Sequence, residues 1–347
     1  MHLYWRFLPP DASDNYCSAW EYTILKFPFF LIQLLGITDM TRHARLALLL
    51  ILATPLVATA QVTLKIQVPD NWSATTTTTA KTAQVLTIAG MDIETNTVQK
   101  VIAKEQAGTR DPTGIIQVNS VIEAMKVKSS FPSGVEIVFD STKENTPAGT
   151  QFDVMLGLYK VMASSKISKK YNKQNRCISL TNKMEGFDEL DLVIKEAMKD
   201  VLEEDYLEEA ENQRLKDLPS KPVNKGDTWP VTMSVRLGGG QVLELKQALT
   251  YQGEVTTKSG AKAHSITGKV ISATLEQDPN ANTPAKITGS ELKVESSSQK
   301  ILFDNDRGMI VLSELKFRLV GDLKLDINGM ELPGKLDLTI EVTALVK

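Results

Sequence analysis

The side chain best suited to acid–base chemistry in this sequence is His264, which lies between Ala263 and Ser265. The other two histidines, His2 and His43, precede the part of the chain that we expect to fold. A Ser/His/Asp triad would therefore depend on His264, but the chain lacks the G-x-S-x-G segment that exposes a nucleophilic serine. A lone histidine between small residues is typical of a strand surface, so we predict no catalytic residue.

Cysteine and metal chemistry have equally few residues to draw on. Cys17 lies near the N-terminus, and Cys177 is the only cysteine after residue 60. A structural zinc site needs four Cys or His ligands, which Cys177 and His264 cannot supply, so we predict neither a metal site nor a cofactor. We expect Cys177 to be a small buried side chain and not a reactive thiol.

Two further segments resemble ion-binding or phosphate-binding loops. The run from Asp304 to Gly308 has the D-x-D-x-G half of a calcium loop but lacks the Glu at position 12. Asp and Asn are also favoured in hairpin turns, so we prefer a turn and keep calcium binding by Asp304 and Asp306 as the alternative. Gly238–Gly240 lacks the Lys-Ser/Thr pair of a phosphate loop, and we predict a hairpin turn there.

An export signal is predicted at residues 40–60. It combines the basic start Met40–Arg45, the apolar run Leu46–Val57 and an A-x-A cleavage site at Ala58–Ala60. The apolar run is shorter than the ~20 residues that a membrane-spanning helix needs. We therefore expect a Sec-type signal peptide, a periplasmic or extracellular destination, and no membrane span in the mature chain. Residues 1–39 would then be a non-native extension, with translation starting at Met40.

Charge gives no basis for a nucleic-acid partner. The first 60 residues hold four basic and four acidic residues, so the rest of the chain keeps the net charge of −3. A nearly neutral, evenly mixed charge does not attract nucleic acid or an anionic membrane surface. An unknown protein or lipid of the cell envelope remains as the expected partner.

Apolar and polar residues alternate through most of the chain from Leu64 onward, and this period predicts β-strands. The strands fall into two β-rich halves, 61–186 and 227–347, and a short helix is predicted over Phe152–Ala163. We therefore predict a mainly β (α+β) fold with long antiparallel strands in one or two curved sheets.

The two halves follow a similar order. Trp72 and Trp229 begin them, and a Phe-Asp pair ends a later strand in each, at Phe139-Asp140 and Phe303-Asp304. An ancient duplication and chance alternation explain this equally well.

Residues 187–226 form the joint between the halves. Apolar residues recur at helical spacing from Leu190 to Leu202, which predicts one long helix over about 187–218, packed on the sheet. The apolar stripe thins at residues 203–205, where a bend or break is expected. Prolines after the helix end it, since they donate no backbone hydrogen bond.

Two local features of the strands can also be predicted. The alternation over Ile116–Val127 slips by one residue near Glu123, as a β-bulge would cause. The last two strands form a hairpin, and its turn lies either at Asn328-Gly329 or at Pro333-Gly334.

Three segments carry a resemblance to a known group of proteins. They are Val135–Ser141, which ends in FDS, the junction Leu218–Trp229, which has the form LPxKPVxxGDxW, and Ile301–Asp304 followed by Gly308. Together they resemble a family of uncharacterised exported bacterial proteins, a domain of unknown function. The resemblance covers most of residues 61–347. It implies an exported β-rich domain and brings no catalytic residues.

Two functions are consistent with these observations. The first is a non-enzymatic protein of the periplasm or cell envelope with a structural or interaction role. The second is a carrier of an apolar ligand such as a lipid, in which the curved sheet forms a half-barrel covered by the helix. A large apolar pocket beneath the helix would favour the carrier, whereas a filled core would exclude it. An enzyme is the least supported class, because histidine and cysteine chemistry is so sparse.

Overall fold

The computed structural model describes residues 61–347, apart from residues 148, 258–259, 279–280, 282, 284 and 328. The predicted signal peptide at 40–60 and the predicted extension at 1–39 lie outside the described residues.

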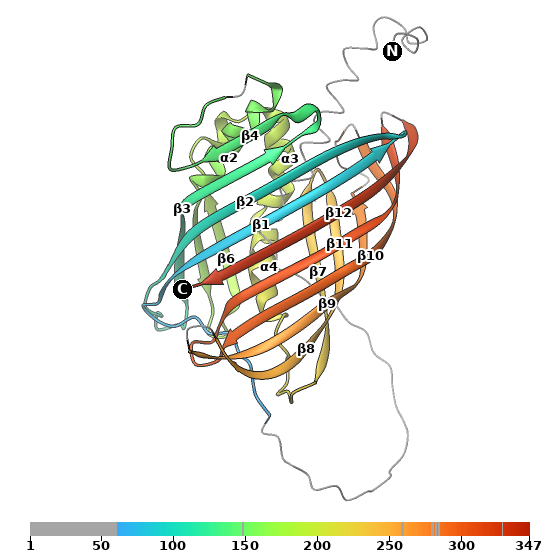
Figure 1. Ribbon diagram of the computed structural model, residues 1–347. Coiled ribbons are helices and arrows are strands. Elements are labelled where there is room, and N and C mark those ends of the chain that lie inside the picture. The colour runs from blue at the N-terminus through green and yellow to red at the C-terminus, as the bar shows by residue number, and fades with distance from the viewer. Residues whose placement is uncertain are drawn as a thin grey trace, which may run out of the picture.

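Within these residues, twelve strands form one antiparallel sheet that curves into a half-barrel (Figure 1). The strands are β1 (Ser73–Ile88), β2 (Met91–Ala107), β3 (Ile116–Ser130), β4 (Glu136–Asp140), β5 (Lys166–Tyr171), β6 (Cys177–Lys183), β7 (Thr228–Gly238), β8 (Gln241–Thr256), β9 (Lys262–Gln277), β10 (Ala285–Asp304), β11 (Met309–Ile327) and β12 (Met330–Val346). Their order is β6-β5-β3-β2-β1-β12-β11-β10-β9-β8-β7, and β4 pairs with β3. The predicted mainly β, antiparallel fold is confirmed.

The two β-rich halves share this sheet, because β1 pairs with β12 along its length, from Thr76 opposite Val346 to Ile88 opposite Gly334. The structure therefore contains no separate sheet for each half, and it does not confirm a duplication. Buried residues alternate with more exposed ones along parts of most strands, for example in β3 and β8, as the period of two requires. The buried faces of β1, β2 and β7–β12 pack together in a core that includes Leu86, Leu245 and Phe317.

Both local predictions for the strands can be compared with the pairing. Ile102 lies opposite Ala124 and Ala103 lies opposite Ile122, so Glu123 is the extra residue of a bulge, as predicted. Ile327 pairs with Met330, so the last hairpin turn lies between these two residues. The alternative, Pro333-Gly334, lies inside β12.

The single long helix predicted over 187–218 is instead two helices, α3 (Leu192–Leu202) and α4 (Glu204–Asn212), with short 3-10 turns before and after them. The break is at Glu203, whose φ of −56° and ψ of 130° are not helical. Arg236 of β7 stabilises this break, since its Nη1 donates to the carbonyl oxygen of Asp200 at 2.7 Å and pairs with the Glu203 carboxylate at 2.6 Å. The predicted short helix is confirmed as α2 (Val154–Ala163).

Helices α3 and α4 stand on the open side of the half-barrel, between its two edge strands (Figure 1). Asn212 at the end of α4 binds the backbone of edge strand β6, because its side chain accepts from the Cys177 N–H and donates to the Cys177 carbonyl. Asp200 of α3 accepts from the Gly240 N–H at the β7–β8 turn. The helix pair thus links the two sheet edges and satisfies backbone groups that an edge leaves unpaired.

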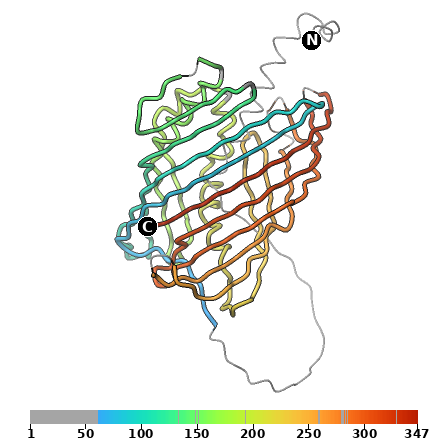
Figure 2. The backbone as a smooth tube through the Cα atoms, in the orientation of Figure 1, coloured from blue at the N-terminus to red at the C-terminus, as the bar shows by residue number. Residues whose placement is uncertain are grey.

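Residues 61–72 do not form the predicted strand. They make a single bridge, from Val62 to Val223, form a turn at Asp70 and Asn71, and cross the end of the half-barrel (Figure 2). The Gln67 N–H donates to the Gly308 carbonyl, and Arg110 donates to the Val68 carbonyl. The alternation that suggested a strand is nevertheless real, because it directs every second side chain inward.

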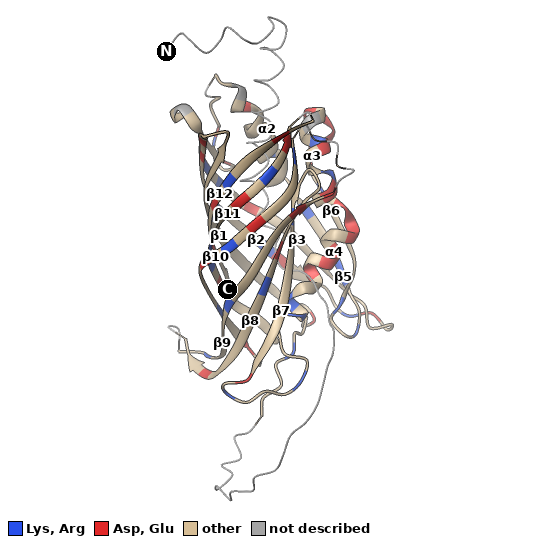
Figure 3. Cartoon of the chain, turned by 90° about the vertical axis from the view of Figure 1, so that its right-hand side faces the viewer, with Lys and Arg blue, Asp and Glu red and all other residues tan. Residues whose placement is uncertain are grey.

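Charged residues of both signs are scattered along the strands, and α4 is mainly acidic (Figure 3). None of the helices formed by the described residues is both long enough and apolar enough to span a membrane.

Gly321 of β11 provides a test of the strand packing. A Cβ atom at this position would overlap the carbonyl oxygen of Glu291 in the neighbouring strand, and backbone cannot move aside as a flexible side chain can. Gly321→Ala is therefore expected to lower the free energy of unfolding by roughly 1–3 kcal/mol, measured by urea denaturation. The control is Gly289→Ala in β10, where the added atom would meet only the flexible Lys324 side chain, at 3.4 Å. Equal stabilities of the two variants would contradict this packing.

Candidate functional site

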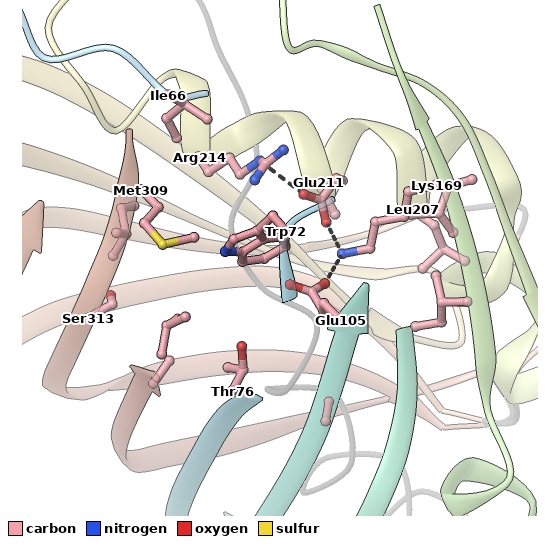
Figure 4. Close-up of a pocket in the computed structure, with 17 residues that line it drawn as sticks. Ile66, Trp72, Thr76, Glu105, Lys169, Leu207, Glu211, Arg214, Met309 and Ser313 are labelled. Carbon is pink, nitrogen blue, oxygen red and sulfur yellow. Dashed lines mark hydrogen bonds and ion pairs between the residues drawn. The ribbon is translucent and has the colours of Figure 1, made fainter. Parts of the chain in front are cut away.

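A pocket of about 390 Å³ lies between α4 and the concave face of the sheet (Figure 4). Leu207, Ala210 and Glu211 of α4 form one wall, and the inner faces of β1, β2, β5, β6, β11 and β12 form the other. Ile66 and Trp72, from the segment that crosses the end of the half-barrel, complete the lining. Most of the lining is apolar.

Several small inward residues border the space at this end of the sheet. The inward face of β12 carries Leu336, Leu338 and Ile340 in the filled core, but Ala344 at the pocket. Three more small residues line the pocket on neighbouring strands, namely Thr76, Ala103 and Ser313. Thr76 lies opposite Ala103, and Ser313 lies opposite Ala344. These residues face inward because they alternate with outward-facing residues along each strand. Their small side chains leave the pocket unfilled.

Four charged side chains form a continuous chain of ion pairs at one side of the pocket. The Lys169 ammonium of β5 lies 2.8 Å from a carboxylate oxygen of Glu105 and 2.8 Å from one of Glu211. Arg214 Nε lies 3.0 Å from the other Glu211 oxygen, which also accepts a 2.8 Å hydrogen bond from the Tyr171 hydroxyl. The pairs join β2, β5 and the helical cover, and the Lys169 side chain is only 12% exposed.

Electrostatics keep Lys169 and Glu211 charged. Burial alone would lower the pKa of Lys169, but the Glu105 and Glu211 carboxylates outweigh it and raise that pKa above its usual value. For Glu211, burial acts to raise the pKa, whereas Lys169 and Arg214 act more strongly and lower it to about 2. Burial raises the pKa of Tyr171, so its hydroxyl keeps the proton that it donates to Glu211.

Two hydrogen-bond donors at the pocket remain unused. The indole Nε1 of Trp72 and the Nη2 of Arg214 are buried, and neither has a partner among the described residues. Both side chains lie at the pocket (Figure 4). A buried donor without a partner loses its hydration and gains nothing in return, so an acceptor placed here would be bound favourably.

Sequence reasoning missed the ion-paired residues, although the sequence carries a signal for them. Lys169 has the same strand phase as the apolar residues Ile167 and Tyr171, and Glu105 has the phase of Val101 and Ala103. A charged residue in the inward phase of a strand predicts a buried charge, and buried charges need partners. The identity of the partners depends on how β2, β5 and α4 meet, which strand phase cannot show.

The residues that the sequence singled out lie elsewhere. His264 is on β9, where its Nδ1 lies 2.7 Å from the Tyr251 hydroxyl, and it does not line the pocket. Cys177 is completely buried, as predicted, and burial raises its pKa to about 11. It is therefore a poor nucleophile at neutral pH.

Both suspected loops are turns. Asp304 accepts from the N–H groups of Asp306 and Arg307 in the turn between β10 and β11. The predicted glycine turn is confirmed, since β7 ends at Gly238 and β8 begins at Gln241. Among the residues that the structure describes, no group of three or more His, Cys, Asp or Glu side chains could hold a metal ion.

A second hollow of about 480 Å³ lies on the outer side of α3. Charged side chains of Asp188, Lys195, Glu196 and Lys199 contribute much of its lining. It lacks the mostly apolar lining of the pocket beneath α4, which is therefore the better candidate site.

No protein-family model matches the chain, and no curated protein matches it. Among solved structures, one similar to it is a lipovitellin described for its lipid–protein interactions, with 10% sequence identity and a TM-score of 0.40, over 80% of this chain and 25% of that chain. Another is an outer membrane channel from Pseudomonas putida F1, with 9% identity and a TM-score of 0.24, over 82% of this chain and 98% of that chain. The match thus spans a quarter of the lipovitellin chain. Both TM-scores are low, so neither likeness bears on function.

The ion-pair chain predicts a specific pH dependence of stability. The pKa of Glu211 falls from 4.5 to about 2 on folding, so its stabilising effect is complete above pH 4.5 and is lost as the pH decreases toward 2. One pKa unit corresponds to ~1.4 kcal/mol. The free energy of unfolding of Glu211→Gln should therefore be about 3 kcal/mol lower than that of the wild type at neutral pH. This difference should vanish near pH 2.

Urea denaturation over a series of pH values measures this difference. The control is Glu204→Gln, which removes an exposed carboxylate from the first turn of the same helix and should change stability little at any pH. If the loss of unfolding free energy in Glu211→Gln stayed constant over the whole pH range, the lowered pKa of Glu211 would be contradicted.

Proposed function

We propose that this protein is a carrier that binds an apolar small molecule, such as a lipid, in the pocket beneath α4. The observation that carries the proposal is a mostly apolar hollow of about 390 Å³ in a sheet whose other end is packed with buried apolar side chains. Ligand pockets of proteins have volumes of roughly 300–1,000 Å³ and combine apolar walls with a few polar groups. This pocket has both properties.

Binding without catalysis is the simplest use of this pocket. Its charged groups are engaged with one another, in the chain of ion pairs from Glu105 through Lys169 and Glu211 to Arg214. An acid or base catalyst needs a group whose pKa is close to the working pH, and the pKa of Glu211 is held at about 2. The proposal therefore includes no enzymatic activity.

The proposed carrier works outside the cytoplasm, because an export signal is predicted over residues 40–60. An apolar molecule dissolves poorly in an aqueous compartment such as the periplasm, and a pocket that removes its surface from water overcomes this cost. The alternative, a structural or interaction protein of the envelope, does not require the pocket to bind anything. Ligand binding thus separates the two functions.

A pocket-filling variant tests the proposal. Ala103→Phe places a ring among the small residues that leave the pocket open, so it should weaken binding of the apolar fluorescent probe N-phenyl-1-naphthylamine at least about tenfold, a loss of ~1.4 kcal/mol. Fluorescence titration of the purified protein measures the dissociation constant.

The matched control is Ala83→Phe, which adds the same ring to an exposed position of β1 on the convex face. It should bind the probe like the wild type. A wild-type protein that does not bind the probe, or two variants that bind it equally well, would count against the carrier.

A further inference from the structure

The polar side of the pocket indicates what kind of apolar molecule it accepts. Arg214 Nη2 and Trp72 Nε1 are the two buried donors at this pocket without a partner in the described part of the chain. They come from different elements, the 3-10 turn after α4 and the segment before β1. Both are donors only, because neither guanidinium nor indole N–H accepts a hydrogen bond. The ligand must therefore supply an acceptor oxygen.

Charge balance indicates whether that oxygen is charged. Along the ion-pair chain positive and negative groups alternate, in the order Glu105, Lys169, Glu211, Arg214. Two cations and two carboxylates leave no net charge in this cluster. A carboxylate ligand would add a buried negative charge beside two others without a free cation to balance it, and an unbalanced buried charge is strongly unfavourable.

An uncharged carbonyl oxygen avoids this penalty. It has two lone pairs and can accept from two donors, and it leaves the charge of the cluster unchanged. A plain hydrocarbon also leaves the charge unchanged, but it would keep both donors unpaired. Sites with buried donors discriminate strongly against analogues that lack the matching acceptor.

We infer that the pocket selects uncharged acyl lipids, whose ester carbonyl accepts hydrogen bonds from Arg214 Nη2 and Trp72 Nε1 while the acyl chain lies against the apolar walls. This inference rests on the proposed carrier function. It distinguishes esters from free fatty acids, which share the same chain and differ in charge.

Three ligands of equal chain length test it: methyl dodecanoate, dodecanoate and dodecane. Each competes with N-phenyl-1-naphthylamine for the purified full-length protein at pH 7.5, where dodecanoate is ionised. The ester should bind at least about tenfold more tightly than either of the others.

Two variants connect this preference to the donors. Trp72→Phe keeps an aromatic ring but removes the N–H, and Arg214→Met removes the guanidinium. Each should reduce the preference for ester over dodecane at least about threefold. The Trp72 variant leaves the ion pairs intact, so it remains informative if the Arg214 variant folds poorly. Trp229→Phe is the control, because the Trp229 Nε1 donates to the Asp217 carbonyl away from the pocket.

The possible results distinguish a failure of the ester selection from a failure of the carrier function. If the probe and all three ligands fail to bind, the carrier function fails and the inference fails with it. If the ligands bind but the acid is tightest, or all three are equal, the carrier stands and the selection for esters is wrong. An ester preference that survives Trp72→Phe and Arg214→Met would also overturn the assignment.

Discussion

The ion pairs of Lys169 connect the helical cover to the sheet, and the pocket depends on this connection. Lys169 projects from β5 toward the inside, where Glu105 of β2 and Glu211 of α4 each lie 2.8 Å from its ammonium. An inward lysine on an apolar strand face is costly unless it is paired. The pairing therefore ties α4 to strands β2 and β5.

Side-chain size then determines where the half-barrel is solid and where it is hollow. The same strands carry Leu, Ile and Phe in the filled core at one end, and they contribute small residues such as Ala103, Ser313 and Ala344 to the pocket at the other. The two helices close the open side. Asn212 of α4 binds the backbone of β6, and Arg236 of β7 binds the end of α3. One sheet thus supplies both a filled core that stabilises the fold and a hollow that remains available for a ligand.

Much of the fold could be predicted from local sequence, because strand phase is a local property. It predicted the antiparallel strands, the bulge at Glu123 and the glycine turn at Gly238–Gly240. The helix was predicted in the correct place but as one piece, since the anchoring of the break by Arg236 comes from a distant strand. The site could not be predicted, because its parts lie far apart in the chain and carry no familiar motif. Only the inward phase of Lys169 and Glu105 gave a local signal.

The proposed carrier holds an apolar molecule in the pocket beneath α4 in its native envelope. Native mass spectrometry of the protein, purified without detergent from the cells that produce it, tests this claim most directly. We expect a population heavier than the processed chain by one small molecule, which organic solvent releases and which Ala103→Phe does not retain. A single mass equal to that of the bare polypeptide, unchanged after gentle purification, would contradict the account.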